Sequence, residues 1–203
     1  MKKLIALVAC LAITASTSAD VTTLFDGGNG LSTPPDAVYW DLETTTIGLI
    51  ITGFDTNTDA ALGEAFNVRV YTIEGGFAGN EFDENLWTQV ATGVGTGNGT
   101  GNSVDNVVLS NSFTLDAGIT YGMVMVYDGP GGVNYTNGAT GTPFAGSDGA
   151  TLFSGVSQST AFSSTLFADR IWNGTIYYTA IPEPASAAIL GLGGVVLLLR
   201  RRR

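Results

Sequence analysis

The segment ITYGMVMVY, residues 119–127, is apolar on both faces, which is typical of a strand in the centre of a buried sheet. The chain around it carries the two-residue period of half-buried strands. In residues 66–71, for example, Phe66, Val68 and Val70 alternate with more polar neighbours. These patterns predict a sheet with one central strand and several flanking ones.

Further strands are expected on both sides of this segment. In residues 171–180, Trp172, Ile176 and Tyr178 share one face, and no interior segment has a sustained helical period. The glycine-rich tract at 93–102 reads as a mobile loop. The other candidate strands are 21–25, 37–42, 45–52, 86–92, 104–110 and 150–156, separated by Gly, Asn, Asp and Pro turn signals. Roughly nine or ten short strands predict an all-β body, a single jelly-roll-like β-sandwich over residues 20–181.

The composition of this body excludes several kinds of chemistry. Residues 20–181 contain no histidine, lysine or cysteine, since Cys10 and both lysines lie near the N-terminus. Ser-His and Cys-His catalysis, Schiff-base lysines, His or Cys metal sites and disulfides are therefore excluded. Arg69 and Arg170 are the only basic residues against seventeen acidic ones, so the net charge is −15. That sign argues against binding to nucleic acid or anionic membranes and favours solubility.

The N-terminus has the three regions of a secretory signal peptide, residues 1–19. Lys2 and Lys3 precede an apolar stretch at 4–13 and a small-residue segment at 14–19. Cleavage after Ala19 would make Asp20 the new N-terminus, and cleavage one residue earlier is the near alternative. A lipoprotein-like box ends at Cys10, but the apolar run continues past it, which favours the secretory interpretation. The chain is therefore expected to be exported.

The C-terminus, residues 182–203, predicts a membrane anchor. Pro182, Glu183 and Pro184 precede the uncharged run 185–199, and Arg200, Arg201, Arg202 and Arg203 end the chain. Fifteen helical residues span roughly 22 Å, a short transmembrane helix that flanking residues can extend. Four arginines are costly to translocate, which places them in the cytoplasm and the body outside. The arginines are thus the predicted membrane stop signal.

These three parts, in this order at the C-terminus, resemble the PEP-CTERM sorting signal. The resemblance implies processing near the motif by an exosortase, an integral-membrane enzyme of biofilm-forming bacteria, with Pro182, Glu183 and Pro184 as the recognition residues. An ordinary tail anchor that happens to begin with these residues is the alternative. The body also resembles secreted sandwich domains found ahead of such tails, through the phrases at 113–121 and 172–178. Those phrases consist of packing and turn residues and imply no activity.

Asp55, Asn57 and Asp59 have the spacing of the first three ligands of a calcium loop. The match then fails, because Ala60 replaces the required glycine and Phe66 stands where a bidentate glutamate is needed. A solvated turn without a cofactor is therefore favoured, and a calcium site is the alternative. A looser calcium site would draw on this segment or on Glu81, Asp83 and Glu84.

Two sugar-related functions survive the exclusions. Glycoside hydrolysis needs only a carboxylate pair, but no motif selects two of the seventeen acids. Carbohydrate binding would use aromatic stacking, although the strand pattern places most aromatics in the core. The candidate rings are Tyr39, Trp40, Trp87, Tyr135 and Trp172.

The sequence therefore predicts a non-enzymatic structural protein of the cell surface or extracellular matrix of a biofilm. As a precursor it would be held in the inner membrane by its C-terminal helix, and an exosortase would then process it. The expected partners are the exosortase, the membrane and exopolysaccharide, and nucleic acid is not among them. The alternative is a carbohydrate-binding module delivered to the same place.

Overall fold

The computed structural model describes residues 18–25, 29–31, 34–99, 101, 104–163 and 165–181. These residues form β-strands and two short 3₁₀ turns, without an α-helix among them, which confirms the all-β class. No helix in the described ranges is long and apolar enough to cross a membrane. The predicted transmembrane helix at 185–199 and the predicted signal peptide, apart from Ser18 and Ala19, lie outside these ranges.

Fourteen strands are hydrogen-bonded into one sheet. In chain order they are β1 (Ser18–Thr22), β2 (Asn29–Gly30), β3 (Asp36–Thr44), β4 (Leu49–Thr56), β5 (Ala65–Glu74), β6 (Thr88–Thr96), β7 (Asp105–Leu109), β8 (Phe113–Leu115), β9 (Thr120–Asp128), β10 (Asn134–Asn137), β11 (Pro143–Ala145), β12 (Ala150–Gln158), β13 (Phe167–Trp172) and β14 (Gly174–Ala180). The 3₁₀ turns are η1 (Glu84–Leu86) and η2 (Ser147–Gly149).

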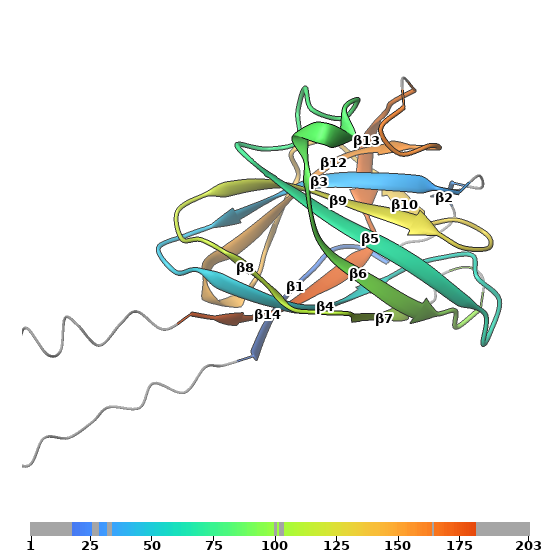
Figure 1. Cartoon of the computed structure of the whole chain (residues 1–203), viewed down its shortest axis with the longest axis horizontal. Helices are drawn as coiled ribbons and strands as arrows, with labels where there is room; N and C mark the ends of the chain where they lie inside the picture. The colour runs from blue at the N-terminus through green and yellow to red at the C-terminus, as the bar shows by residue number, and fades with distance from the viewer. Residues whose placement is uncertain are drawn as a thin grey trace, which may run out of the picture.

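The sheet curls on itself (Figure 1). Its strand order is β1-β14-β4-β7-β6-β5-β9-β3-β12-β13-β10-β2, with β8 paired to β4 and β11 to β12. Neighbouring strands are antiparallel throughout. β9, the strand predicted from residues 119–127, lies between β5 and β3 and is buried on both faces, so that prediction is confirmed.

The interior of the curl holds a continuous apolar core, here called the inner cluster. Trp40 and Trp172 stack at its centre with ring centroids 4.4 Å apart and planes within 8°, and Phe54 meets Trp172 edge-on at 6.0 Å. Its largest fully buried members are Trp40, Trp172, Tyr127, Tyr178, Phe54 and Phe66. Trp172, Ile176 and Tyr178 are all buried, as their shared face predicted.

The predicted strand at 171–180 is in fact two strands. β13 ends at Trp172 and pairs with β12 and β10, whereas β14 begins at Gly174 and pairs with β4 and β1. A side chain at Gly174 would bring a Cβ within 2.0 Å of the Trp172 ring. Glycine at this position therefore lets the chain change neighbours while the indole stays in the core.

The glycine-rich tract is also not entirely a loop, because β6 continues through Gly93 and Gly95 to Thr96. A Cβ at Gly95 would lie 2.0 Å from the Phe66 ring, and one at Gly93 would lie 2.7 Å from Val107. These glycines leave room for large neighbours inside the curl. The prediction of a loop at 93–102 is thus wrong for its first four residues.

Candidate functional site

The junction between the body and the C-terminal tail is held within the sheet. β14 lies between β1 and β4, and Ala180 at its end pairs with Leu49. The next residue, Ile181, donates its backbone N–H to the Gly48 carbonyl at 2.8 Å. The predicted sorting residues Pro182, Glu183 and Pro184 and the stop signal Arg200, Arg201, Arg202 and Arg203 lie outside the described residues. In the sequence, Pro182 directly follows Ile181.

Asp55, Asn57 and Asp59 do not form a solvated turn. Asp55 lies in β4, where it is 9% exposed and accepts hydrogen bonds from the Tyr177 hydroxyl at 2.6 Å and the Asn106 amide at 3.1 Å. Asn57 is fully buried. The turn interpretation was wrong because antiparallel pairing with β14 continues through Asp55 to Thr56.

Several other polar groups of this segment form hydrogen bonds within the protein. The Asn57 amide donates to the Gly101 carbonyl at 2.7 Å, and Asp59 accepts from Asn134 at 3.0 Å. Buried Asp105 accepts from the backbone N–H and the hydroxyl of Thr58, at 2.9 and 2.5 Å. The described residues contain no group of three acidic side chains arranged to hold a metal ion. The segment thus acts as a strand end held by hydrogen bonds.

The second set of calcium candidates lies in the β5–β6 connection. Glu81 is 6% exposed, and Asp83 caps η1 by accepting from the Asn85 backbone at 3.0 Å. Glu84 accepts from the Tyr71 hydroxyl at 2.7 Å. Asp83 and Glu84 therefore have separate local roles in this loop, one as the cap of η1 and the other as the acceptor for a β5 hydroxyl.

The five rings proposed for sugar stacking are all buried. Tyr39, Trp40 and Trp172 are fully inaccessible, and Trp87 and Tyr135 are less than a tenth exposed. The expectation that most of these aromatics are core residues is confirmed. Phe82 is the exposed large aromatic on the described surface, at 52%.

Four strands, β3, β5, β9 and β12, and two connections build a second apolar cluster on the outside of the sheet. This outer cluster consists of Ala37, Tyr39, Tyr71, Phe77, Trp87, Val124, Val126 and Val156. Phe77 and Trp87 come from the β5–β6 connection, and Phe162 packs over them from the β12–β13 connection. Tyr39 meets Trp87 at 5.8 Å and Phe162 at 6.1 Å, both edge-on. Sequence patterns missed this cluster because two loops, rather than a strand, supply its cover.

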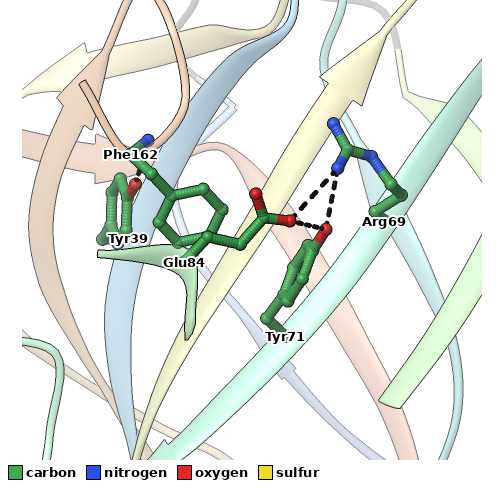
Figure 2. A network of polar contacts seen from close by, with 5 residues as sticks. All are labelled: Tyr39, Arg69, Tyr71, Glu84 and Phe162. Carbon is green, nitrogen blue, oxygen red and sulfur yellow. Dashed lines mark hydrogen bonds and ion pairs between the residues drawn. The ribbon is translucent and has the colours of Figure 1, made fainter. Parts of the chain in front are cut away.

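A polar network closes this cover (Figure 2). Arg69 donates to the Tyr71 hydroxyl at 2.7 Å, Tyr71 donates to Glu84 at 2.7 Å, and Arg69 and Glu84 form an ion pair at 3.6 Å. Burial and the hydrogen bond to Glu84 raise the pKa of Tyr71. The Tyr39 hydroxyl accepts from the Phe162 backbone at 3.1 Å and donates to Gln158 at 2.6 Å. The arrangement fastens the β5–β6 and β12–β13 loops to the sheet.

One carboxyl group has an unusual environment. Asp36 at the start of β3 is fully buried, and its Oδ1 has no hydrogen-bond partner among the described residues. Burial raises its pKa from 3.8 to about 7, against the opposing effect of a hydrogen bond from the Val133 backbone. A raised carboxyl pKa is common among catalytic acids, but this side chain is sealed from any substrate.

Comparison with known proteins adds one match. Residues 180–203 match the sequence model of a family described as the PEP-CTERM protein-sorting motif. No curated protein matches the chain. The match begins at the last residue of β14, and it supports an exported protein that is membrane-associated before an exosortase sorts it. The chain therefore carries a PEP-CTERM sorting motif, as its Pro-Glu-Pro sequence, apolar run and terminal arginines predicted.

Proposed function

We propose that this protein is a structural component of the bacterial cell surface or biofilm matrix, delivered there by its sorting tail. The observation that carries the proposal is the motif at 180–203, attached directly to a folded all-β body. Cleavage of the leader and insertion of the apolar run would hold the precursor in the inner membrane, with the body outside. Processing by an exosortase would then release the body to the surface or the surrounding matrix.

The proposed body is a jelly-roll-like sandwich without catalytic activity. The curl of the sheet around one apolar core supports the sandwich description. The absence of His, Lys and Cys from residues 20–181 supports the lack of activity, since carboxylates would then have to supply the catalytic acid and base. Asp36 and Asp105, two of its carboxylates, are fully buried and unsuited to contact a substrate. The acidity of the body would serve solubility and hydration in the matrix.

A carbohydrate-binding body is the alternative, in which exopolysaccharide is the ligand. With the five predicted rings buried, stacking would have to use a ring at the surface. Tyr177 is the better placed, because it is partly exposed, lies against Gly53 and is held by the Asp55 carboxylate at 2.6 Å. Phe82 is more exposed but lies on the β5–β6 loop.

Intact-mass measurement on protein from cells with and without the exosortase tests the sorting proposal. We expect loss of residues 1–19 in both strains and loss of the arginine-rich end only where the enzyme is present. A matched variant with Pro182, Glu183 and Pro184 replaced by alanine should keep Arg203 in both strains. A secreted wild-type species that still ends at Arg203 in the presence of the enzyme would contradict the proposal.

A glycan array and a hydrolysis screen on the processed protein separate the structural, binding and enzymatic possibilities. A structural protein gives neither retention nor product, a binding module gives retention without product, and an enzyme gives product. Retention that disappears in Tyr177→Ala but persists in Phe82→Ala would support the carbohydrate-binding alternative. Turnover abolished by one carboxylate substitution, with the fold intact, would overturn the non-enzymatic assignment.

A further inference from the structure

The strands next to the two processing signals are partners in the sheet. β1 pairs with β14 in an antiparallel register, with Ser18 opposite Thr179 and Ala19 opposite Tyr178. Ser18 and Ala19 are the last residues of the predicted leader, and Thr179 immediately precedes the matched sorting region. Figure 1 shows the start of β1 and the end of β14 at the same side of the body. The leader therefore enters the fold beside the point where the tail leaves it.

Leader removal would shorten β1 at this point only. Hydrolysis of the Ala19–Asp20 bond consumes one water and leaves a carboxylate on Ala19 and an ammonium group on Asp20. The remaining part of β1 stays in place, since Val21 is 1% exposed and the Thr23 hydroxyl donates to the Trp172 carbonyl at 2.5 Å and the Gly174 carbonyl at 3.1 Å. Cleavage thus removes only the β1 neighbours of Thr179 and Tyr178, Ser18 and Ala19, and leaves Asp20, Val21 and Thr22 paired with β14.

After this cut, the end of β14 has one neighbour among the described strands. Thr179 pairs with Ile50 and Ala180 with Leu49 on the β4 side, and the opposite edge carries no strand beside Thr179. An open strand edge exposes backbone donors and acceptors that an extended segment of a partner can pair with. A strand end held from one side also separates from the sheet more readily than one held from both.

The sorting motif follows closely in the chain after the edge of β14 that leader removal opens. Pro182 directly follows Ile181, whose N–H is bonded to Gly48 at 2.8 Å. Three residues from Pro182 to Pro184 reach at most about 10 Å when fully extended. An enzyme that holds the motif therefore lies against the last residues of β14.

We propose that Thr179 and Ala180 form part of the surface that the tail-processing enzyme engages, and that leader removal uncovers Thr179 within it. Signal-peptide cleavage then precedes and accelerates tail processing in the same molecule. This inference rests on the proposed sorting function and adds an order to its two steps. The pairing of β1 with β14 couples signal-peptide cleavage to tail processing.

Two fusions with the same unrelated signal peptide test the inference. In the first, that peptide is joined to Ser18, so that the mature chain keeps Ser18 and Ala19 in β1. In the matched control it is joined to Asp20, and intact mass confirms both mature N-termini. In cells that contain the exosortase, pulse–chase should show the Ser18 form losing its arginine-rich end about fivefold more slowly, because retained strand pairing is worth about one net hydrogen bond.

A third variant separates edge coverage from other effects of the two extra residues. Insertion of a flexible Gly/Ser segment of about ten residues between Ile181 and Pro182 moves the motif away from β14. In the Ser18 form this insertion should restore the processing rate of the control. Equal rates in the first two fusions, or slow processing that the insertion does not relieve, would overturn the inference while leaving the sorting function intact. Failure of both fusions to be processed at all would contradict the sorting function and the inference together.

Discussion

The inner and outer clusters share the strands β3, β5, β9 and β12 but are built differently. Along β3, Val38 and Trp40 point into the curl, whereas Ala37 and Tyr39 point to the outer cluster. The inner cluster is enclosed by strands that include β3, β4, β5, β9 and β14. The outer cluster is covered by connections that contribute Phe77, Trp87 and Phe162.

This difference has an energetic consequence. An inner residue cannot be exposed without separating hydrogen-bonded strands, so its loss should weaken the whole body. An outer residue can be exposed when the β5–β6 loop lifts from the sheet, which breaks few backbone hydrogen bonds. Substitutions in the two clusters should therefore differ in size and in how much of the molecule responds.

Trp172→Ala should have the largest effect. Its indole is fully buried, stacks on Trp40 at 4.4 Å and donates to the Thr56 hydroxyl at 3.1 Å. We expect a loss of roughly 3 to 5 kcal/mol in the free energy of unfolding, measured by urea denaturation. Trp172→Phe is the control that keeps part of the packing and should lose less. A loss below about 1 kcal/mol for the alanine variant would show that Trp172 is not a core residue.

Trp87→Ala should be milder and more local. The ring packs on Tyr39, and its Nε1 donates to the Asn80 carbonyl at 2.8 Å. We expect a loss of roughly 2 kcal/mol in the free energy of local opening of the β5–β6 loop, seen as faster hydrogen exchange and proteolysis confined to residues 75–87. Uniformly faster exchange across β9 and β3 would mean that the outer cluster is as integral as the inner one.

Asp36→Asn tests how a buried carboxyl group, instead of an apolar side chain, affects the free energy of unfolding. Asp36 lies at the buried start of β3, and its pKa is raised to about 7, so the folded state binds a proton more tightly than the unfolded state. Stability contributed by the protonated form is therefore lost as the pH rises from about 4 to about 7. The asparagine variant should lack this loss and be more stable by roughly 1 to 2 kcal/mol above pH 7, less than the full shift implies because the native state relaxes.

The measurement is the difference between the stability curves of the two proteins over pH 4 to pH 8. Other carboxylates contribute equally to both curves, so the difference isolates Asp36. A difference that does not change with pH, or one that favours wild type at high pH, would contradict the raised pKa.

Arg69→Gln should have the smallest effect. The Arg69 and Glu84 side chains are 34% and 52% exposed, and exposed ion pairs contribute little. We expect a loss below about 1 kcal/mol and a coupling energy with Glu84→Gln in the same range, from a double-mutant cycle. Tyr71→Phe, which removes the hydroxyl between them, is the matched control. A coupling above roughly 2 kcal/mol would make this network a major support of the outer cover.

The sequence by itself predicted the features that depend on local order. Alternation along residues 66–71 and 171–180 identified inward-facing residues, and the two-sided apolar run at 119–127 identified the central strand β9. The sorting motif was also readable, because its recognition depends on residues that are consecutive in the chain. Each of these features follows from side-chain chemistry at fixed spacing, which requires no knowledge of distant contacts.

Tertiary structure decided what depends on residues far apart in the chain. Asn57 is buried, rather than in a solvated turn, because β4 is held by β14 more than a hundred residues away. Gly95 lies in a strand because it pairs with Phe66 in β5, whose ring occupies the space of a Cβ, and Tyr39 is buried outside the curl because two loops fold over it. The pairing of β1 with β14, which places the leader beside the tail, likewise arises only when the sheet closes. Local periodicity cannot specify which distant segment supplies a neighbour, since that choice is made by packing of the whole sheet.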